Sequence, residues 1–579
     1  MTAADSPTLV PFVLNGEEVS VADGITLLDA LRDELGCHSV KDGCSPQGQC
    51  GCCTIWVDGA PRVACVTPIR RVKGREVTTL EGVPDEQRDK WANAFVAHGA
   101  SQCGFCTPGI VMRLAALESG SAEAPGRARN ASPMELRRDI EAGLRAHLCR
   151  CTGWQSIVEA AVDVLGNTSE TGAGATSRDQ LLAGWRAQLE GPAFQSSGTD
   201  VVLGGGGFAD DTAPADALLQ LGAGASLASD IRTARQGVGR QGRNSTVSLS
   251  HPVSPAEGAW ALTLATTWVE PAYVEPDASW CRPGEQPASP LANGGAFGGK
   301  RHSPVPARAR SLADEHGHVV RVLWRREDVV RRGPKRPPLG IALRTDGTGV
   351  VRIGRTPGSS DLTSLTEQVQ ALTPGLQVEV VDLEGPVVGS DLRGAGWAEV
   401  LAALHALQAR PEGPDAPHDA RPMLTVGTGR ADVTVPGGGR AIAEVHPEDR
   451  DGGRSSVEVD VWAGEVLCAV TLRSYALGAV HQALGMVWSE GIAVDETGEP
   501  VDLTIRSFGI LAARDMPEVV VRLHENDGWP VNGSDAVFVA TLAAAWIAEG
   551  LPAEWPTRRA AVRAPVRDVA PSGGREEEP

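Results

Sequence analysis

The residues best suited to chemistry are cysteines, and they gather near the N-terminus: ten of the 12 Cys lie before residue 152. Such crowding in a chain that lacks a secretory signal favours metal binding or redox chemistry over disulfides. Cys44, Cys50 and Cys53 lie in a Gly-rich loop, and Cys65 falls on the return strand of a predicted hairpin. Four such thiolates suit a [2Fe–2S] cluster, whose plant-type spacing is one residue shorter in the first gap, or a structural zinc ion.

A second group of cysteines is carried by predicted helices. Cys103 and Cys106 precede a helix expected to run to Glu118, and Cys149 and Cys151 follow a predicted helix. A single residue between two cysteines is unusual for a zinc site, whose knuckles prefer two to four. Helix N-termini also suit an anionic thiolate cluster. The pattern therefore favours a second iron–sulfur site.

Three other cysteines receive structural interpretations. Cys52 is surplus to the first group and is expected to be a packed neighbour of a ligand. Cys281 and Cys468 stand alone, and lone cysteines are usually small core hydrophobes.

The elements around the two groups have different periodicities. Strands Leu9–Leu14 and Glu17–Val21 flank Asn15-Gly16, a strong hairpin signal, and a helix over Thr26–Leu35 follows. A second hairpin joins strands Thr54–Val57 and Pro61–Val66, which together predict a β-grasp sheet. Apolar residues at helical spacing then predict a four-helix bundle, with helices over the ranges 89–98, 102–118, 134–148 and 152–165.

Composition excludes several classes of function. The net charge is −20, so nucleic acid and anionic membrane surfaces would repel the chain. No uninterrupted apolar run approaches the length of a membrane span, and the first residues do not resemble a secretory signal. We expect a cytoplasmic protein that binds neither nucleic acid nor membrane.

Three motifs strongly resemble the iron–sulfur half of the xanthine dehydrogenase/aldehyde oxidase family of molybdenum hydroxylases. They are Gln102–Gly109 (QCGFCTPG), Leu148–Trp154 (LCRCTGW) and Lys41–Thr54 (KDGCSPQGQCGCCT), the last lengthened by one residue. The resemblance implies that Gln102 touches a molybdopterin cofactor, whereas His147 is expected to be a cap or surface residue. It also implies two sets of [2Fe–2S] ligands, namely Cys44, Cys50, Cys53 and Cys65, and Cys103, Cys106, Cys149 and Cys151.

The later part of the chain resembles a shortened molybdopterin-binding domain of the same family. The matching segments are Leu291–Arg301 (LANGGAFGGKR), Leu392–Gly396 (LRGAG), Gly478–Gly485 (GAVHQALG) and Asp535–Glu549. The resemblance implies cofactor binding by the backbone N–H groups of Phe297 and Gly298 and by the side chain of Gln482.

The same resemblance exposes departures from the family at its catalytic positions. Ser534 stands where the family has a glutamate general base, with Asp535 one residue on. A serine that nothing activates is a poor base, whereas a carboxylate can be tuned to the task. Tyr475 and Arg301 replace a cofactor-binding glutamine and a substrate-contacting acid, while Arg393 could bind an anion or form an ordinary salt bridge. No catalytic residue is therefore assigned.

These observations predict an α+β multidomain chain. Its parts are a β-grasp [2Fe–2S] ferredoxin domain (8–84), a four-helix [2Fe–2S] domain (85–167), a linker (168–180), a truncated and degenerate molybdopterin-binding-type domain (181–565) and a disordered tail (566–579). No FAD-binding segment is recognisable, so a flavin would come from another subunit.

Three functions stay open. The first is an iron–sulfur electron-transfer subunit of a molybdenum hydroxylase-type oxidoreductase, with an FAD-binding partner and a molybdopterin partner. The second is a competent molybdenum hydroxylase acting on N-heterocycles or aldehydes, with its own molybdopterin. The third is a non-catalytic interaction or assembly module with structural metal sites.

Overall fold

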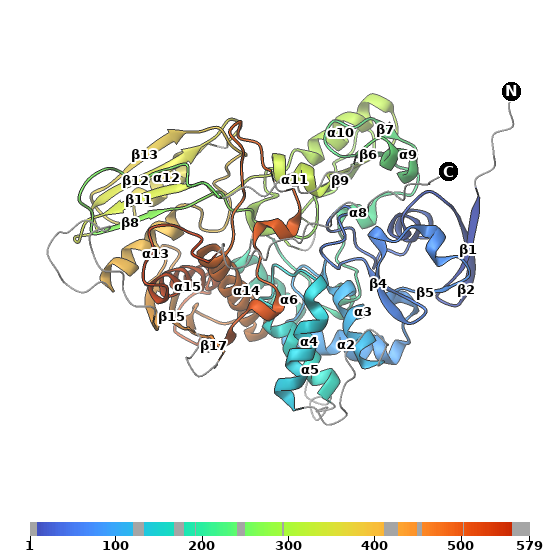
Figure 1. The fold of residues 1–579 in the computed structure, drawn as a ribbon, viewed down its shortest axis with the longest axis horizontal. Coiled ribbons are helices and arrows are strands. Elements are labelled where there is room, and N and C mark those ends of the chain that lie inside the picture. Colours follow the sequence, from blue (N-terminus) through green and yellow to red (C-terminus); the bar gives the residue numbers. More distant parts are fainter. Residues whose placement is uncertain are drawn as a thin grey trace, which may run out of the picture.

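An N-terminal sheet and a bundle of helices come first along the chain, and three further sheets follow, two of which interleave in sequence (Figure 1). This is the α+β multidomain class expected from the sequence. The computed structural model describes residues 8–119, 132–166, 179–191, 193–239, 249–291, 294–359, 361–409, 427–447, 454–501 and 503–558. Most of the expected linker and all of the expected tail lie outside these residues. None of the described helices has the length and apolar character needed to cross a bilayer.

The N-terminal sheet has the order β2-β1-β5-β3-β4, with β1 and β5 parallel at its centre. Its strands are β1 (Leu9–Leu14), β2 (Glu17–Ala22), β3 (Thr54–Val57), β4 (Ala60–Val63) and β5 (Glu76–Thr78). Thr26 caps the short helix α1 (Leu27–Asp29), which continues as a π-helical turn over Ala30–Glu34. The expected β-grasp arrangement and both hairpins are thus present.

Cys65 does not lie on the return strand, contrary to the prediction. Strand β4 ends at Val63, and Cys65 sits in the 3₁₀ turn η2 (Ala64–Val66). This turn lets the Cys65 N–H donate to the sulfur of Cys53 at 3.4 Å, which a ladder-bonded strand residue would not do.

Four helices form the bundle; α2 begins earlier than predicted, α3 and α4 are shorter than predicted, and α5 is offset. They are α2 (Asp85–His98), α3 (Thr107–Glu118), α4 (Pro133–Gly143), extended by the 3₁₀ turn η5 (Leu144–Ala146), and α5 (Gln155–Gly166). The cysteine segments stay outside the helices because they need positive φ. Gly104 has φ +82° before α3, and Gly153 and Trp154 have φ +62° and +66° before α5.

The first sheet after the bundle lies beside the β-grasp domain (Figure 1). Its order is β7-β6-β10-β9, with α10 packed against β9 and β10. The elements of this region are α6 (Gln180–Glu190), α7 (Thr199–Val202), α8 (Ala209–Thr212), β6 (Leu218–Leu221), β7 (Leu227–Ala228), α9 (Ile231–Gln236), β9 (Ala278–Cys281), α10 (Val305–His316) and β10 (Val320–Leu323).

The two remaining sheets have the orders β13-β12-β11-β8 and β14-β15-β16-β17. The first comprises β8 (Leu262–Ala265), β11 (Leu339–Leu343), β12 (Gly349–Arg355) and β13 (Leu376–Asp382), with α11 (Arg326–Arg332), α12 (Thr363–Gln370) and α13 (Trp397–Gln408) nearby. The second comprises β14 (Gly429–Thr434), β15 (Arg440–His446), β16 (Ser456–Trp462) and β17 (Glu518–His524), with α14 (Ala469–Trp488) and α15 (Ser534–Ala548).

Two buried helices connect the last sheet with the iron–sulfur bundle. Strands β14 to β16 alternate buried and solvent-facing residues, which is the pattern of a sheet covered on one face. Helix α15 packs across β14 and β15, and α14 lies against α15 on one side and against α2 and α5 on the other. Almost every residue of α14 is buried because it is covered on both sides.

Candidate iron–sulfur centres and the adjoining cavity

The four cysteines of the first group are buried and lie close together in the loop that precedes β3 and in the turn η2. Hydrogen bonds from the thiols of Cys50 and Cys65 lower the pKa of Cys44, and Cys65 also contacts Cys53. Backbone N–H groups of residues 47 and 49 reach the Cys44 sulfur at 3.3 and 3.5 Å. Donors of this kind stabilise thiolate ligands, and hydrogen bonds to cluster sulfurs tune the cluster potential. The structure thus brings together all four residues expected from the sequence.

Gly43 makes this closure sterically possible. A Cβ at this position would lie 3.0 Å from the Cys50 sulfur and 3.2 Å from the Cys52 sulfur. A side chain here would therefore push the loop away from its own cysteines.

The second cysteine group is arranged as two pairs of sulfurs. The Sγ atoms of Cys151 and Cys103 lie 3.6 Å apart. A hydrogen bond from the Cys106 thiol lowers the pKa of Cys149 to about 6, and Thr152 Oγ1 lies 3.2 Å from the same sulfur. Cys106 is the N-cap residue of α3, where the helix dipole favours a thiolate.

These paired sulfurs fit a two-iron cluster. Two thiolates on one tetrahedral metal, each about 2.3 Å from it, are separated by about 3.8 Å. The 3.6 Å separation of Cys103 and Cys151 matches such a pair, and Cys106 with Cys149 makes the second. These paired thiolate donors suit [2Fe–2S] clusters, which would supply one-electron carriers at these positions.

Cys52 lies between the two groups. Its thiol is fully buried, and burial raises its pKa together with the charges of Cys44, Cys53 and Cys103. The first cysteine loop also touches the start of α3 directly, since a Cβ on Gly109 would lie 2.4 Å from the Gly51 oxygen. Cys52 is thus a packed neighbour of both groups, whereas the sequence placed it beside only the first.

His147 is buried, so it is not a surface residue, but it is a cap: it ends the turn η5, and its N–H donates to the Leu144 oxygen at 2.9 Å. Its Nε2 lies 3.1 Å from Thr54 Oγ1, and its ring packs against Gly51. Burial lowers the pKa of His147 to about 3, so the ring is neutral at physiological pH. It fills the junction between the β-grasp sheet and the helical bundle.

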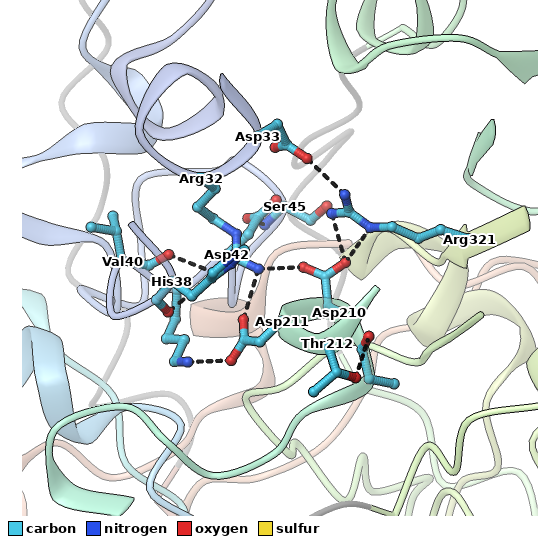
Figure 2. Close-up of polar contacts among 12 residues, drawn as sticks. Arg32, Asp33, His38, Val40, Asp42, Ser45, Asp210, Asp211, Thr212 and Arg321 are labelled. Atoms are coloured by element: carbon cyan, nitrogen blue, oxygen red, sulfur yellow. Dashed lines mark hydrogen bonds and ion pairs between the residues drawn. The ribbon is translucent and has the colours of Figure 1, made fainter. Parts of the chain in front are cut away.

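A buried ionic network holds the first cysteine loop against the C-terminal part (Figure 2). Arg32 of the β-grasp domain donates to Asp210 at 2.7 Å and to Asp211 at 2.8 Å, and Lys41 also pairs with Asp211. Burial opposes ionisation of Asp210, but Arg321 and Arg32 outweigh it and lower its pKa to about 2. Breaking such a network leaves buried charges unpaired, so it specifies where the loop sits.

A cavity of about 250 Å³ separates the second cysteine group from the C-terminal part. Several expected cofactor or catalytic residues line it, as do residues that sequence reasoning missed. The first set comprises Gln102, Phe297, Gly298, Arg393, Asp535, Tyr475 and Arg301, and the second comprises Glu190, Arg150, Glu275 and Asp391. The family motifs thus converge on one place although they are hundreds of residues apart.

Some groups expected to bind molybdopterin already form hydrogen bonds within the protein, and Gln482 lies outside this cavity. Gln102 Nε2 donates to the Cys151 oxygen at 2.8 Å and to Ser474 at 3.1 Å. The N–H of Gly298 bonds the Gly295 oxygen at 2.9 Å inside a 3₁₀ turn, so it is not free to bind a ligand. Gln482 lines a separate void of about 20 Å³ behind Phe297.

At the expected catalytic position, buried residues form hydrogen bonds and ion pairs with one another. Ser534 is fully buried at the start of α15, and its hydroxyl accepts from Arg393 Nη2 at 2.9 Å. A carboxylate is nevertheless present, because Glu190 accepts from the N–H groups of residues 533 and 534 at 3.1 and 2.7 Å. Glu190 is itself paired with buried Arg186, so it caps a helix and neutralises a cation. No pattern in the sequence signals this contact.

The other charged groups of the cavity are paired in the same way. Arg393 pairs with Asp535 at 3.2 Å, which resolves its two expected roles in favour of an ion pair at the cavity wall. Burial raises the pKa of Asp535 while Arg393 opposes that rise. Arg301 is exposed and pairs with Asp391 at 3.2 Å.

Molybdopterin does not fit the residues present. The cavity is smaller than the roughly 300–1,000 Å³ of ordinary organic-ligand sites, and its arginines are neutralised by neighbouring acids. Tyr475 OH and Glu275 Oε1 are the exceptions, since both belong to residues of this cavity and are buried without a partner among the described residues. One hydroxyl and one carboxyl oxygen suit a small polar group or water, and we derive no chemistry through a molybdenum centre.

Comparisons with known proteins also separate the N-terminal cysteine-bearing part from the C-terminal part. The "[2Fe-2S] binding domain" family matches residues 79–162. "Xanthine dehydrogenase iron-sulfur-binding subunit" of Escherichia coli O157:H7 is 37% identical over 147 residues, which are 25% of this chain and 86% of that protein. "Nicotine 6-hydroxylase small subunit" of Paenarthrobacter nicotinovorans is 37% identical over 155 residues, which are 26% of this chain and 87% of that protein.

Similarity in fold extends much further than similarity in sequence. "Aldehyde Oxidoreductase from Desulfovibrio gigas" superposes with a TM-score of 0.67 over 96% of this chain and 99% of that chain, at 15% identity. By sequence, "Aldehyde oxidoreductase" of Megalodesulfovibrio gigas is 40% identical over 156 residues, which are 26% of this chain and only 16% of that protein. The C-terminal part therefore shares the fold with little of the sequence.

Proposed function

Because the chain belongs to the xanthine dehydrogenase/aldehyde oxidase family of molybdenum hydroxylases, we propose that it carries electrons through two [2Fe–2S] clusters as an electron-transfer subunit. We assign the first cluster to Cys44, Cys50, Cys53 and Cys65, and the second to Cys103, Cys106, Cys149 and Cys151. The contact between the first cysteine loop and the start of α3, the helix for which Cys106 is the N-cap residue, carries this proposal. Clusters held by touching elements exchange electrons over a short path.

The chain's own residues perform three tasks in this function. The thiolates hold the irons, and backbone N–H groups aimed at Cys44 and Cys53 stabilise their negative charge. Near-complete burial of six of these cysteines, all but the half-buried Cys103 and Cys151, limits the access of water to the carriers. The second group faces the cavity shared with the C-terminal part, so electrons can enter or leave on that side.

The residues at the expected catalytic position are already held in hydrogen bonds and ion pairs, which argues against an independent hydroxylase. Hydroxylation in the family needs a base, and general-base catalysis is worth about 10²–10⁴-fold. Ser534 is buried and hydrogen-bonded, and Glu190 is committed to Arg186 and the start of α15. We therefore propose that substrate chemistry takes place on another subunit.

Partner subunits follow from the nature of the relatives. The similar proteins of Escherichia coli O157:H7 and Paenarthrobacter nicotinovorans are named as subunits. We propose an FAD-binding partner and a molybdopterin-binding partner for this chain, both in the cytoplasm.

The deciding experiment is metal analysis of the anaerobically purified chain, with EPR of the reduced protein. We expect about four iron atoms per chain, acid-labile sulfide and two S = 1/2 signals. Stoichiometric zinc without sulfide would instead support the structural-module alternative. Stoichiometric molybdenum together with substrate-dependent reduction of the clusters in the chain alone would establish the independent hydroxylase and overturn the proposal.

A further inference from the structure

Helix α6 carries a stripe of large apolar side chains that face solvent. Ten such side chains are exposed in the described part of the chain, and four of them fall within residues 181–194. They are Leu181, Leu182, Trp185 and Phe194, with exposed fractions of 67%, 40%, 56% and 41%. The rings of Trp185 and Phe194 pack edge to face at 6.2 Å, so the two form one surface. Single exposed apolar residues are ordinary, whereas a contiguous group of them marks an interaction surface.

The helix cannot turn this stripe inward. Its opposite face is buried and includes Arg186, which donates to the Glu465 oxygen at 3.4 Å and to the Val531 oxygen. The ring of Phe194 lies over Gly184, where a Cβ would be 2.0 Å from it. The stripe is therefore a fixed feature of the folded chain, and only another molecule can cover it.

The exposed side of α6 carries no charge. The two charged residues of the helix, Arg186 and Glu190, are buried. Its exposed side chains are all uncharged, namely Gln180, Leu181, Leu182, Trp185 and Gln188. The chain as a whole has a net charge of −20, so two copies repel one another over most of their surface. An uncharged apolar face is where a second copy can approach without that repulsion and bury apolar area.

The stripe is also complementary to itself. Leu182, Trp185 and Leu189 are spaced i, i+3 and i+7, which is the spacing of a seam between paired helices. When two copies of α6 pack antiparallel about a twofold axis at Trp185, Leu181 of each copy faces Leu189 of the other. We propose that α6 forms the interface of a homodimer, in which each copy covers the other's apolar stripe.

This interface adjoins the second cysteine group. Leu189 and Glu190, at the end of α6, line the cavity of about 250 Å³ that Cys103 and Cys151 also line. The dimer therefore sets this cavity of each copy beside the contact between the copies. The pairing itself does not depend on the electron-transfer assignment.

Analytical ultracentrifugation of the full-length chain, from submicromolar to tens of micromolar concentration, tests the proposal. One chain has a mass of 60.5 kDa, and we expect a species of twice that mass at the higher concentrations. A species that keeps the mass of one chain over the whole range would overturn the proposal.

A matched pair of variants locates the interface. Trp185→Asp puts a carboxylate at the centre of the contact and should raise the dimer dissociation constant about thirtyfold or more. Leu181→Asp, one turn away, should act in the same direction. Leu9→Asp is the control and should leave the dimer intact, because Leu9 is similarly exposed, at 59%, but lies on β1 of the N-terminal sheet.

All three changes are at exposed positions, so circular dichroism should show an unaltered fold. Equal dissociation constants for the α6 variants and for Leu9→Asp would show that the copies meet elsewhere and would refute the interface. Because the readout is mass, failure of the iron analysis would leave this result intact.

Discussion

The N-terminal cysteine-bearing part and the C-terminal part differ in what each has retained. The first keeps its reactive residues in short loops and is about 37% identical to separate subunits of other organisms. The second keeps a large fold at 15% identity, and Ser534 stands where the sequence comparison predicts the family's carboxylate. A fold tolerates wide change because packing needs only apolar residues of suitable volume, whereas cluster ligation needs particular atoms at particular places.

Among the changes that test this contrast, loss of one cysteine ligand should have the largest effect. Cys106→Ser should abolish one EPR signal and leave the other, because the two groups come from separate segments. Cys281→Ser is the control, since Cys281 is a buried lone cysteine of β9 in the C-terminal part and should leave both signals intact. Loss of both signals from a folded Cys106→Ser protein would contradict the division into two sites.

The buried ion pair between the two parts should have the next largest effect. Arg150, between two cluster cysteines, donates to Glu490 beyond the end of α14 at 2.6 Å, and both side chains are almost fully buried. Glu490→Gln leaves the guanidinium without its charge partner, which costs about 3–5 kcal/mol of unfolding free energy. Denaturant unfolding measures this against Glu379→Gln, whose exposed pair with Arg352 is worth at most about 1 kcal/mol. Equal losses would show that the two parts are not coupled through this pair.

A tight backbone contact between the parts should have a smaller effect. A Cβ on Gly478 of α14 would lie 1.9 Å from the Cys151 oxygen. Gly478→Ala should therefore force the helix away from the second cysteine group, cost about 1–3 kcal/mol and alter the EPR line shape of that cluster. Gly437→Ala is the control because nothing lies within 4 Å of its Cβ position. An unchanged Gly478→Ala protein would mean that α14 does not press on this loop.

The smallest effect is a dependence of stability on pH that arises in the C-terminal part. His481 is fully buried, and burial lowers its pKa to about 3. Below its ordinary pKa of about 6.5 the unfolded chain binds a proton that the folded chain refuses. Its contribution to stability is therefore complete above pH 6.5 and falls by about 1.4 kcal/mol for each pH unit below it.

Unfolding of His481→Gln at pH 7.5 and 5.5 measures this contribution. We expect a shallower loss of stability on acidification than in the unaltered protein. His302→Gln replaces an exposed histidine and should keep the original slope. Identical slopes for all three proteins would show that His481 titrates normally in the fold.

The sequence by itself determined the cluster framework and most elements of the first 166 residues. Cysteine spacing, the Asn15-Gly16 turn and the helical apolar stripes are local signals, so they can be read without knowing the fold. Their errors were local too. Cys65 was misplaced because β4 gives way to the 3₁₀ turn η2 after Val63. The helices that follow the cysteines begin later than predicted because Gly104, Gly153 and Trp154 adopt positive φ.

Only the tertiary structure decided what surrounds the clusters. Glu190 meets Ser534 across 344 residues of chain, and Lys41 meets Asp211 across 170. Neither contact follows from periodicity or spacing, because each depends on how separate elements pack. The same packing creates a cavity beside Ser45 and engages groups expected to bind molybdopterin, such as the Gly298 N–H. Local sequence patterns thus indicate which cysteines are the candidate ligands. What surrounds those cysteines depends on contacts between residues far apart in the sequence.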